Sequence, residues 1–288
     1  MTLTIPKRLV ENCRATPENT AWLERLPTVL HELTERWALT LGEPFDGDEV
    51  SASWVAPVMR ADGTSAVLKL GLPHMEAEHE IQGLRFWDGD PTVWLLEADI
   101  ELNAMLLERC VPGMVLCTLP EPEQDVVIAQ ILRRLWRTPP TPHPFRPLSE
   151  MTAYWSSEAL ANVQSGPDEG IIREGLQLFQ ELPHTASEEV LLSTDLHAGN
   201  VLQAQRKIWL MIDPKPFIGD AAYDATQHLF NCTDRLLQDV KGTIRRFTDL
   251  LDVDYERVRQ WMFARAAVNL HHAQNSPGAI SLFRALAL

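Results

Sequence analysis

The chain has 288 residues with 25 Lys or Arg and 40 Asp or Glu, which gives a formal net charge of −15. This sign argues against general nucleic-acid binding, which relies on cations to neutralise phosphates, and against an anionic membrane surface as a partner. Hydrophobic residues make up 45% of the chain, an ordinary share for a globular protein, so disorder is excluded over most of its length.

The first third of the chain is expected to combine helices with a small sheet. Residues 1–40 have helical spacing, and Pro27 with Thr28 fits a helix start. The Asp62-Gly63 pair is a strong signal for a hairpin turn. The elements predicted after residue 40 are strands at 51–59, 64–70, 93–96 and 104–108 and a helix at 75–87.

The remainder of the chain has mostly helical patterns. An amphipathic helix is expected around Ile128 to Leu135. The proline-rich segment 139–147 predicts an extended, stiff connector. The other predicted elements are helices at 149–163, 169–182 and 221–286, a strand at 190–192, and a hairpin of 201–204 with 208–212.

No targeting signal, membrane span or metal-binding cysteine pair is expected. The sequence has no run of about 18 uncharged apolar residues, and its start lacks the pattern of a signal peptide. No C-x-x-C pair occurs among its four cysteines, which are Cys13, Cys110, Cys117 and Cys232. We expect reduced thiols in a cytoplasmic protein.

A polar loop after the strand at 190–192 holds the densest set of reactive groups. It contains Asp195 and Asn200, and Asp213 follows at the end of another apolar strand. Carboxylate and amide oxygens are the ligands that Mg²⁺ prefers, and a free Asp beside them can accept a hydroxyl proton. An Asp base, an Asn ligand and a second metal-binding Asp are typical of phosphoryl transfer by protein-kinase-type enzymes. The alternative is that these residues only form turns.

An early strand carries Lys69, and the next helix carries Glu80. A strand Lys paired with a helix Glu holds nucleotide phosphates in kinases. Glu80 is preferred over Glu76 because it shares the inward helix face with Leu84 and Trp87. The alternative is a surface lysine whose apolar stem lies along the protein while its ammonium stays in water. Lys69→Ala is expected to damage phosphoryl transfer far more than folding, because a half-exposed lysine contributes little to stability.

The chain resembles the aminoglycoside phosphotransferase family of kinase-like enzymes, most closely its branch of streptomycin 6-kinases and hydroxyurea-type resistance kinases. The resemblance runs from about residue 40 to 270. The motifs that carry it are Leu68-Lys69-Leu70, Gly83-Leu84-Arg85-Phe86-Trp87, Leu106-Leu107-Glu108-Arg109 with Pro112-Gly113, Asp195-Leu196-His197-Ala198-Gly199-Asn200, and Ile212-Asp213-Pro214-Lys215 with Gly219-Asp220 and Tyr223-Asp224. The chain departs from the family at Ser193-Thr194, where His-Gly is usual, and at Pro216, where Gly is common.

The resemblance implies an α+β, protein-kinase-like fold with two lobes. The N-terminal lobe, residues 1–107, would hold a leading helix, a five-stranded antiparallel sheet and the Glu80 helix. The larger, mostly helical C-terminal lobe, residues 108–288, would begin at the hinge. The segment from Asp46 to Val58 would cover the nucleotide phosphates.

The resemblance also implies a role for each candidate residue. Asp195 would be the catalytic base, and Asn200 and Asp213 would bind Mg²⁺. Lys69 paired with Glu80 would hold the phosphates of ATP, and hinge backbone at Glu108 and Cys110 would bind adenine. Asp220 and Asp224 would be supporting or substrate-binding acids, with helix capping as the alternative.

The expected activity is ATP- and Mg²⁺-dependent phosphorylation of a hydroxyl group on a small molecule. The resemblance implies an aminoglycoside or aminocyclitol antibiotic such as streptomycin as the preferred acceptor, and a cationic molecule would suit the negative chain. The alternatives are a kinase of another metabolite, such as hydroxyurea or a sugar, and a non-catalytic nucleotide-binding protein. Neither nucleic acid nor membrane is expected as a partner, and the oligomeric state stays open. The acids considered for an acceptor pocket are Glu121, Glu123, Glu158, Asp168, Glu169, Asp220, Asp224 and Asp234.

Overall fold

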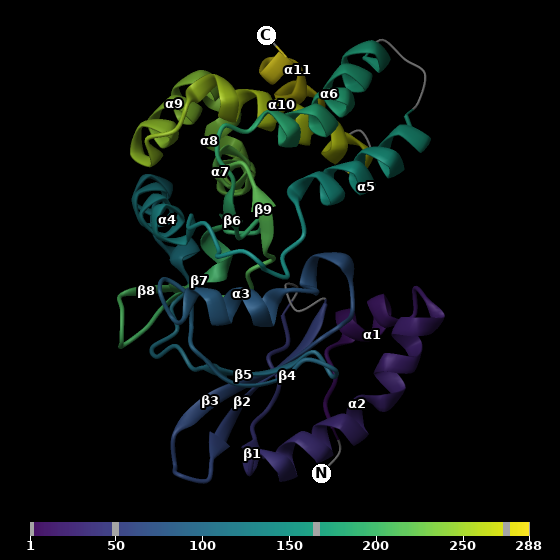
Figure 1. The fold of residues 1–288 in the computed structure, drawn as a ribbon, viewed down its shortest axis with the longest axis vertical. Coiled ribbons are helices and arrows are strands. Elements are labelled where there is room, and N and C mark those ends of the chain that lie inside the picture. The colour runs from purple at the N-terminus through teal and green to yellow at the C-terminus, as the bar shows by residue number, and fades with distance from the viewer. Residues whose placement is uncertain (1–2, 48–51, 164–167, 273–276, 288) are drawn as a thin grey trace. The chain divides into compact units, whose positions relative to one another are not determined.

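The computed structural model describes residues 3–47, 52–163, 168–272 and 277–287 (Figure 1). The chain forms two compact units, Met1–Gly113 with Gln203–Leu210 and Met114–Leu202 with Met211–Leu288. The first unit therefore extends past the expected border at residue 107, and it takes in the tip of a hairpin from the second half of the sequence.

The first unit contains the antiparallel five-stranded sheet, in the order β1-β2-β3-β5-β4, which confirms this part of the fold (Figure 1). Its strands are β1 Leu39–Leu41, β2 Ser53–Arg60, β3 Ser65–Gly71, β4 Leu95–Asp99 and β5 Ala104–Glu108. The β2–β3 turn is at Asp62-Gly63, where Gly63 has a φ of +81°. The strand expected at 93–96 instead begins at Leu95, because Trp94 exchanges hydrogen bonds with Glu108 and a register shift follows. Residues 48–51 of the segment expected to cover phosphates lie outside the described residues.

Two helices, α1 Lys7–Cys13 and α2 Pro17–Arg36, precede the sheet. The helix start expected at Pro27 is wrong, because Pro27 lies inside α2. The helix begins ten residues earlier, where the Thr16 hydroxyl accepts from the Asn19 amide at 3.2 Å and proline stands at the first helical position, which needs no amide donor. Buried side chains of α2, including Leu30 and Leu33, share one hydrophobic core with those of the sheet.

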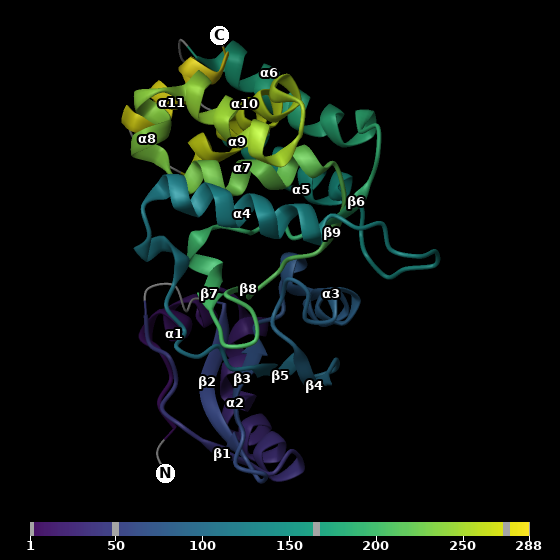
Figure 2. The same cartoon turned by 90° about the vertical axis from the view of Figure 1, so that its left-hand side faces the viewer.

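The second unit is mostly helical, as expected. Its helices are α4 Glu121–Leu135, α5 Leu148–Ala161, α6 Glu169–Glu181, α7 Ala221–Asn231, α8 Thr233–Gln238, α9 Val240–Leu251, α10 Tyr255–His272 and α11 Pro277–Ala287. Figure 2 shows α4 and α7 side by side. The side chains of Phe179, Tyr223 and Trp261 pack edge to face or tilted in the core that joins α6, α7 and α10.

Short strands in the second unit position the polar loop. The strand β6 Val190–Leu192 and the hairpin of β7 Val201–Gln203 with β8 Trp209–Met211 confirm the predictions. An additional strand, β9 Phe217–Gly219, pairs antiparallel with β6. The polar loop therefore begins at the end of a paired and buried strand.

Across the described ranges, no helix combines the length and the apolar character needed to cross a membrane. The four cysteines, all of which lie in described parts of the chain, are free thiols.

Candidate active site

The backbone at the start of the polar loop is hydrogen-bonded to the carboxylate of Asp224 on α7. Asp224 is 1% exposed and accepts from the Ser193 amide at 2.9 Å and the Thr194 amide at 2.7 Å. The indole of Trp136 donates to the same carboxylate at 3.2 Å. Burial raises the pKa of Asp224 to about 6, although these donors act in the opposite direction. Asp224 therefore organises loop backbone and is shielded from solvent.

Thr194 has a φ of +51°, a left-handed conformation that β-branched residues rarely adopt. Its hydroxyl donates to the Lys215 carbonyl at 2.7 Å, and the Lys215 amide donates to the Ser193 carbonyl at 2.9 Å. These bonds hold the loop in a conformation that glycine would adopt without strain. The departure from His-Gly at this position therefore leaves a defined loop geometry.

Asp195 follows in the loop, and both of its carboxylate oxygens have partners. Gln227 Nε2 donates to Oδ1 at 2.7 Å, and Lys215 Nζ lies 2.7 Å from Oδ2. The side chain retains 18% exposure. Asp195 is therefore an oriented carboxylate that solvent-borne molecules can reach.

Asn200 and Asp213 flank the open end of the β7–β8 hairpin. The Ile212 amide donates to the Asn200 carbonyl at 2.9 Å, which places the two segments side by side. Asn200 Nδ2 donates to the Asp195 carbonyl at 3.0 Å, so Oδ1 is the atom of this amide that is left to bind a cation. Asn200 and Asp213 are both half-buried and supply oxygen ligands, so the donor set fits Mg²⁺.

In the first unit, Lys69 on β3 forms an ion pair with Glu80 on α3, Glu80–Trp87. Lys69 Nζ lies 2.6 Å and 2.7 Å from the two Glu80 carboxylate oxygens. The side chains are only 8% and 2% exposed. The expectation of a half-exposed lysine is therefore wrong, because α3 covers this face of the sheet.

This burial changes the expected result of replacing Lys69. Lys69→Ala leaves the Glu80 carboxylate buried without its cation, so we expect the free energy of unfolding to fall by about 3–5 kcal/mol. The double variant Lys69→Met/Glu80→Leu should recover much of that loss, since it buries no charge, and should still lack phosphoryl transfer. Denaturant unfolding and a kinase assay measure the two effects. A double variant with wild-type turnover would contradict the role of Lys69.

The side chains of the candidate hinge residues Glu108 and Cys110 are both partly buried. The Glu108 carboxylate accepts from Arg206 at 2.8 Å and from the Trp94 amide at 3.0 Å. Arg206 also donates to the carbonyls of Gly89 and Thr92, so it secures the tip of the β7–β8 hairpin within the first unit. Cys110 is half-buried, and burial raises the pKa of its thiol to about 11, which keeps it protonated.

Asp220 is the N-cap of α7. Its Oδ1 accepts from the Ala222 amide at 3.0 Å, and its Oδ2 accepts from Arg257 Nε at 2.6 Å and Trp261 Nε1 at 2.7 Å. The helix-capping alternative therefore describes Asp220, whose carboxylate is fully used inside the protein.

Several acids considered for an acceptor pocket are also neutralised by arginines of the same unit. Such pairs are Glu121 with Arg235, Asp168 with Arg284, Glu169 with Arg173 and Asp220 with Arg257. Glu123 and Asp234 are exposed. A cationic acceptor would therefore meet fewer available carboxylates than the sequence suggests.

Three polar side chains of the second unit, Asp125, His228 and Cys232, form a buried cluster that the sequence did not reveal. Asp125 accepts from His228 Nε2 at 2.8 Å and from both terminal nitrogens of Arg235 at 2.6 Å and 2.8 Å. The guanidinium on this carboxylate repels a metal cation, so the cluster is a structural network of α4, α7 and α8.

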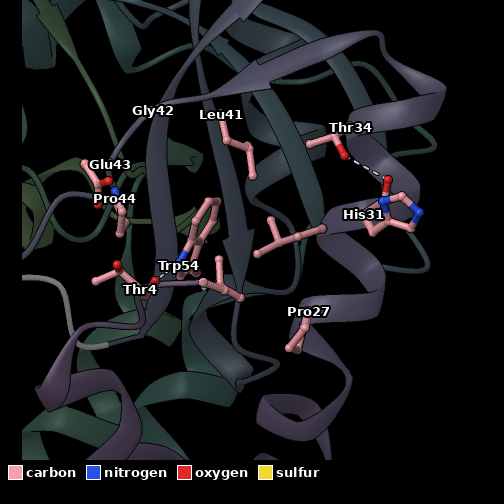
Figure 3. A pocket seen from close by; sticks show the side chains of 11 residues that line it. Thr4, Pro27, His31, Thr34, Leu41, Gly42, Glu43, Pro44 and Trp54 are labelled. Atoms are coloured by element: carbon pink, nitrogen blue, oxygen red, sulfur yellow. Dashed lines mark hydrogen bonds between the residues drawn. The ribbon is translucent and has the colours of Figure 1, made fainter. Parts of the chain in front are cut away.

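A cavity of about 260 Å³ lies in the first unit between α2, β1 and β2 (Figure 3). The buried indole of Trp54 lines it and donates to the Thr4 carbonyl at 3.1 Å. Its other lining residues include Leu30, His31 and Glu43. None of the predicted site residues lines this cavity.

The chain is similar in fold to solved structures of an aminoglycoside phosphotransferase and a choline kinase. The chain aligns with aminoglycoside phosphotransferase APH(4)-Ia with a TM-score of 0.61 and 15% identity, over 91% of this chain and 98% of that one. It aligns with the choline kinase LicA from Streptococcus pneumoniae with a TM-score of 0.61 and 11% identity, over 91% and 97% of the two chains. These likenesses confirm the two-lobed, protein-kinase-like fold.

Comparison of the sequence with known proteins identifies the family within the kinases of this fold. Residues 36–275 match the family model described as aminoglycoside/hydroxyurea antibiotic resistance kinase. The chain is 35% identical to streptomycin 6-kinase of Streptomyces glaucescens, over 93% of this chain and 92% of that protein. It is 34% identical to hydroxyurea phosphotransferase of Kitasatospora aureofaciens, over 86% and 73%. The chain therefore belongs to the aminoglycoside/hydroxyurea antibiotic resistance kinase family, and it is a small-molecule kinase.

Proposed function

We propose that the protein transfers the γ-phosphoryl group of ATP to a hydroxyl group of an aminoglycoside antibiotic such as streptomycin, with Mg²⁺ as cofactor. The observation that carries the proposal is the carboxylate of Asp195, which has a partner on each oxygen and is still partly exposed. The oxygen donors Asn200 and Asp213 in the same unit support it. The relatives named streptomycin 6-kinase support this choice of acceptor.

The residues divide the proposed reaction between them. Asp195 accepts the proton of the acceptor hydroxyl while that oxygen attacks the γ-phosphorus, and ADP leaves with the bridging oxygen. Lys69, held by Glu80, contacts the nucleotide phosphates, and the hinge backbone at Glu108 and Cys110 holds the adenine. Asn200 and Asp213 would hold Mg²⁺, which when bound neutralises charge on the phosphates.

The alternative acceptors are hydroxyurea and other small metabolites, since a hydroxyurea phosphotransferase is among the relatives. A panel that includes streptomycin, other aminoglycosides, hydroxyurea, choline and simple sugars separates these, with ADP release and product mass as readouts. Mass-shifted streptomycin supports the proposal. Phosphorylation of hydroxyurea alone overturns the acceptor and keeps the kinase, whereas nucleotide binding without any product favours a non-catalytic protein.

A cationic acceptor predicts a specific response to salt. The formal charge of −15 should attract the acceptor over a range that falls from about 30 Å at 0.01 M salt to about 3 Å at 1 M. We therefore expect the KM for streptomycin to rise with ionic strength while kcat stays nearly constant. Steady-state kinetics with added KCl measure both. A KM for streptomycin that is independent of salt would contradict the expectation that the negative charge attracts the acceptor.

We also propose a cytoplasmic location, which the four free thiols support. Cell fractionation with an antibody to the protein tests it.

A further inference from the structure

Asp195 is held by a side chain that the phosphoryl-transfer motif does not include. Gln227 on α7 donates from Nε2 to Asp195 Oδ1 at 2.7 Å. We infer that Gln227 is a positioning residue for Asp195, and that Arg265 on α10 in turn fixes the orientation of the Gln227 amide. The inference rests on the proposed function and deepens it, because it concerns how the base is held.

The orientation of the Gln227 amide follows from its two partners. The Arg265 guanidinium only donates, and one of its terminal nitrogens donates to Gln227 Oε1. An ionised Asp195 only accepts, so it requires the amide nitrogen. A flipped amide would place oxygen against carboxylate and nitrogen against guanidinium, and both hydrogen bonds would be lost. One amide orientation is therefore selected.

Arg265 is itself immobilised. Its guanidinium lies 4.6 Å from the centroid of the Tyr223 ring. Its other terminal nitrogen donates to the Thr226 hydroxyl, which donates to the Tyr223 carbonyl at 2.6 Å. Tyr223 and Thr226 are 5% and 0% exposed. The hydrogen bonds that lead from Asp195 through Gln227 and Arg265 therefore end in the core of the second unit.

The second partner of the Asp195 carboxylate is Lys215. Its Nζ lies 2.7 Å from Oδ2, and its side chain is 25% exposed. Each carboxylate oxygen has two acceptor sites, so a site on each oxygen remains for the acceptor hydroxyl. Without Gln227, the carboxylate can rotate about its terminal torsion, which is broad for Asp. A reacting group displaced by about 1 Å can cost about 10²-fold in rate.

The test begins with Gln227→Ala and Arg265→Lys. We expect Gln227→Ala to lower kcat about 10- to 100-fold, with the KM values for ATP and acceptor changed less than about 3-fold. Arg265→Lys, which cannot make both hydrogen bonds in the same geometry, should lower kcat in the same direction by less. Thermal unfolding midpoints record any loss of folded protein.

A matched control is Gln177→Ala. Gln177 Nε2 also donates to a carboxylate at 2.7 Å, that of Glu181, but on the exposed face of α6. This variant should keep wild-type kcat. A Gln227→Ala enzyme with wild-type kcat, or one whose KM values rise while kcat is unchanged, overturns the inference.

A double-mutant cycle with Asp195→Asn separates positioning from a direct or merely structural role. If Gln227 acts through Asp195, the double variant should have the kcat of Asp195→Asn alone. A further fall equal to that of Gln227→Ala in the wild-type background overturns the inference. If Asp195→Asn itself is fully active, the proposed base is wrong. If only Gln227→Ala is fully active, the proposed function stands and the positioning role fails.

Discussion

Asp195→Asn is expected to lower kcat by about 10²- to 10⁴-fold, the range contributed by a general base. The neutral amide cannot take the proton of the acceptor hydroxyl. It also removes the negative charge that pairs with Lys215 Nζ, which lies 2.7 Å from Asp195 Oδ2. Nucleotide binding should persist, because the groups proposed to hold the phosphates, adenine and metal are unchanged. Steady-state kinetics and calorimetric titration with ATP and Mg²⁺ separate these effects.

Asp99→Asn is a matched control for this variant. Asp99 also lies in a close ion pair, at 2.6 Å with Arg36, and its side chain has 17% exposure against 18% for Asp195. It lies at the end of β4, outside the polar loop. Its replacement should leave kcat unchanged. If Asp195→Asn turned over at the wild-type rate, Asp195 would not be the base.

Asp213→Ala is expected to remove Mg²⁺-dependent nucleotide binding. Loss of groups that merely support a metal ligand costs about 10- to 100-fold in metal affinity, so loss of a ligand itself should cost more than about 100-fold. Calorimetric titration of ATP with and without Mg²⁺ measures the difference between the two affinities. That difference should nearly vanish in the variant.

Asp213 has a φ of +56°, so its replacement also changes a residue with a left-handed backbone. Asp252→Ala controls for this effect. Asp252 lies in the same unit, has a φ of +59° and is an exposed helix C-cap. Both variants should lose similar stability from the backbone, but Asp252→Ala should bind nucleotide with Mg²⁺ normally. Unchanged Mg²⁺-dependent affinity in Asp213→Ala would place the metal elsewhere.

The sequence predicted the polar loop well, since strand and turn patterns are local. Short apolar runs placed β6 and the β7–β8 hairpin within a residue or two of their observed bounds. The preference for Glu80 over Glu76 as the partner of Lys69 agrees with the ion pair, because helical spacing identifies which side chains face inward. The predicted ends of helices were less accurate where packing overrides local preference. Pro27, for example, lies inside the 20-residue helix α2 and not at a helix start.

The side chains around Asp195 could not be found from the sequence in the same way. Gln227 and Arg265 are 32 and 70 positions beyond Asp195, on helices whose patterns show burial but not which residues meet. Glu108 and Arg206 are likewise 98 positions apart. Such contacts depend on how separate helices and strands pack together. The type of a residue does not indicate which distant residue it will contact.

What the sequence determined by itself is the set of chemical groups: a lysine on a strand, a glutamate on a helix, and an aspartate, asparagine and aspartate after short strands. Local propensity and periodicity suffice for that, because each depends on neighbours a few residues away. Only the tertiary structure decided their environments. It buried Lys69 and Asp224, neutralised acids that were candidates for an acceptor pocket, and oriented Asp195 from two sides. Burial and charge pairing depend on residues distant in the chain, and these set what each group can do.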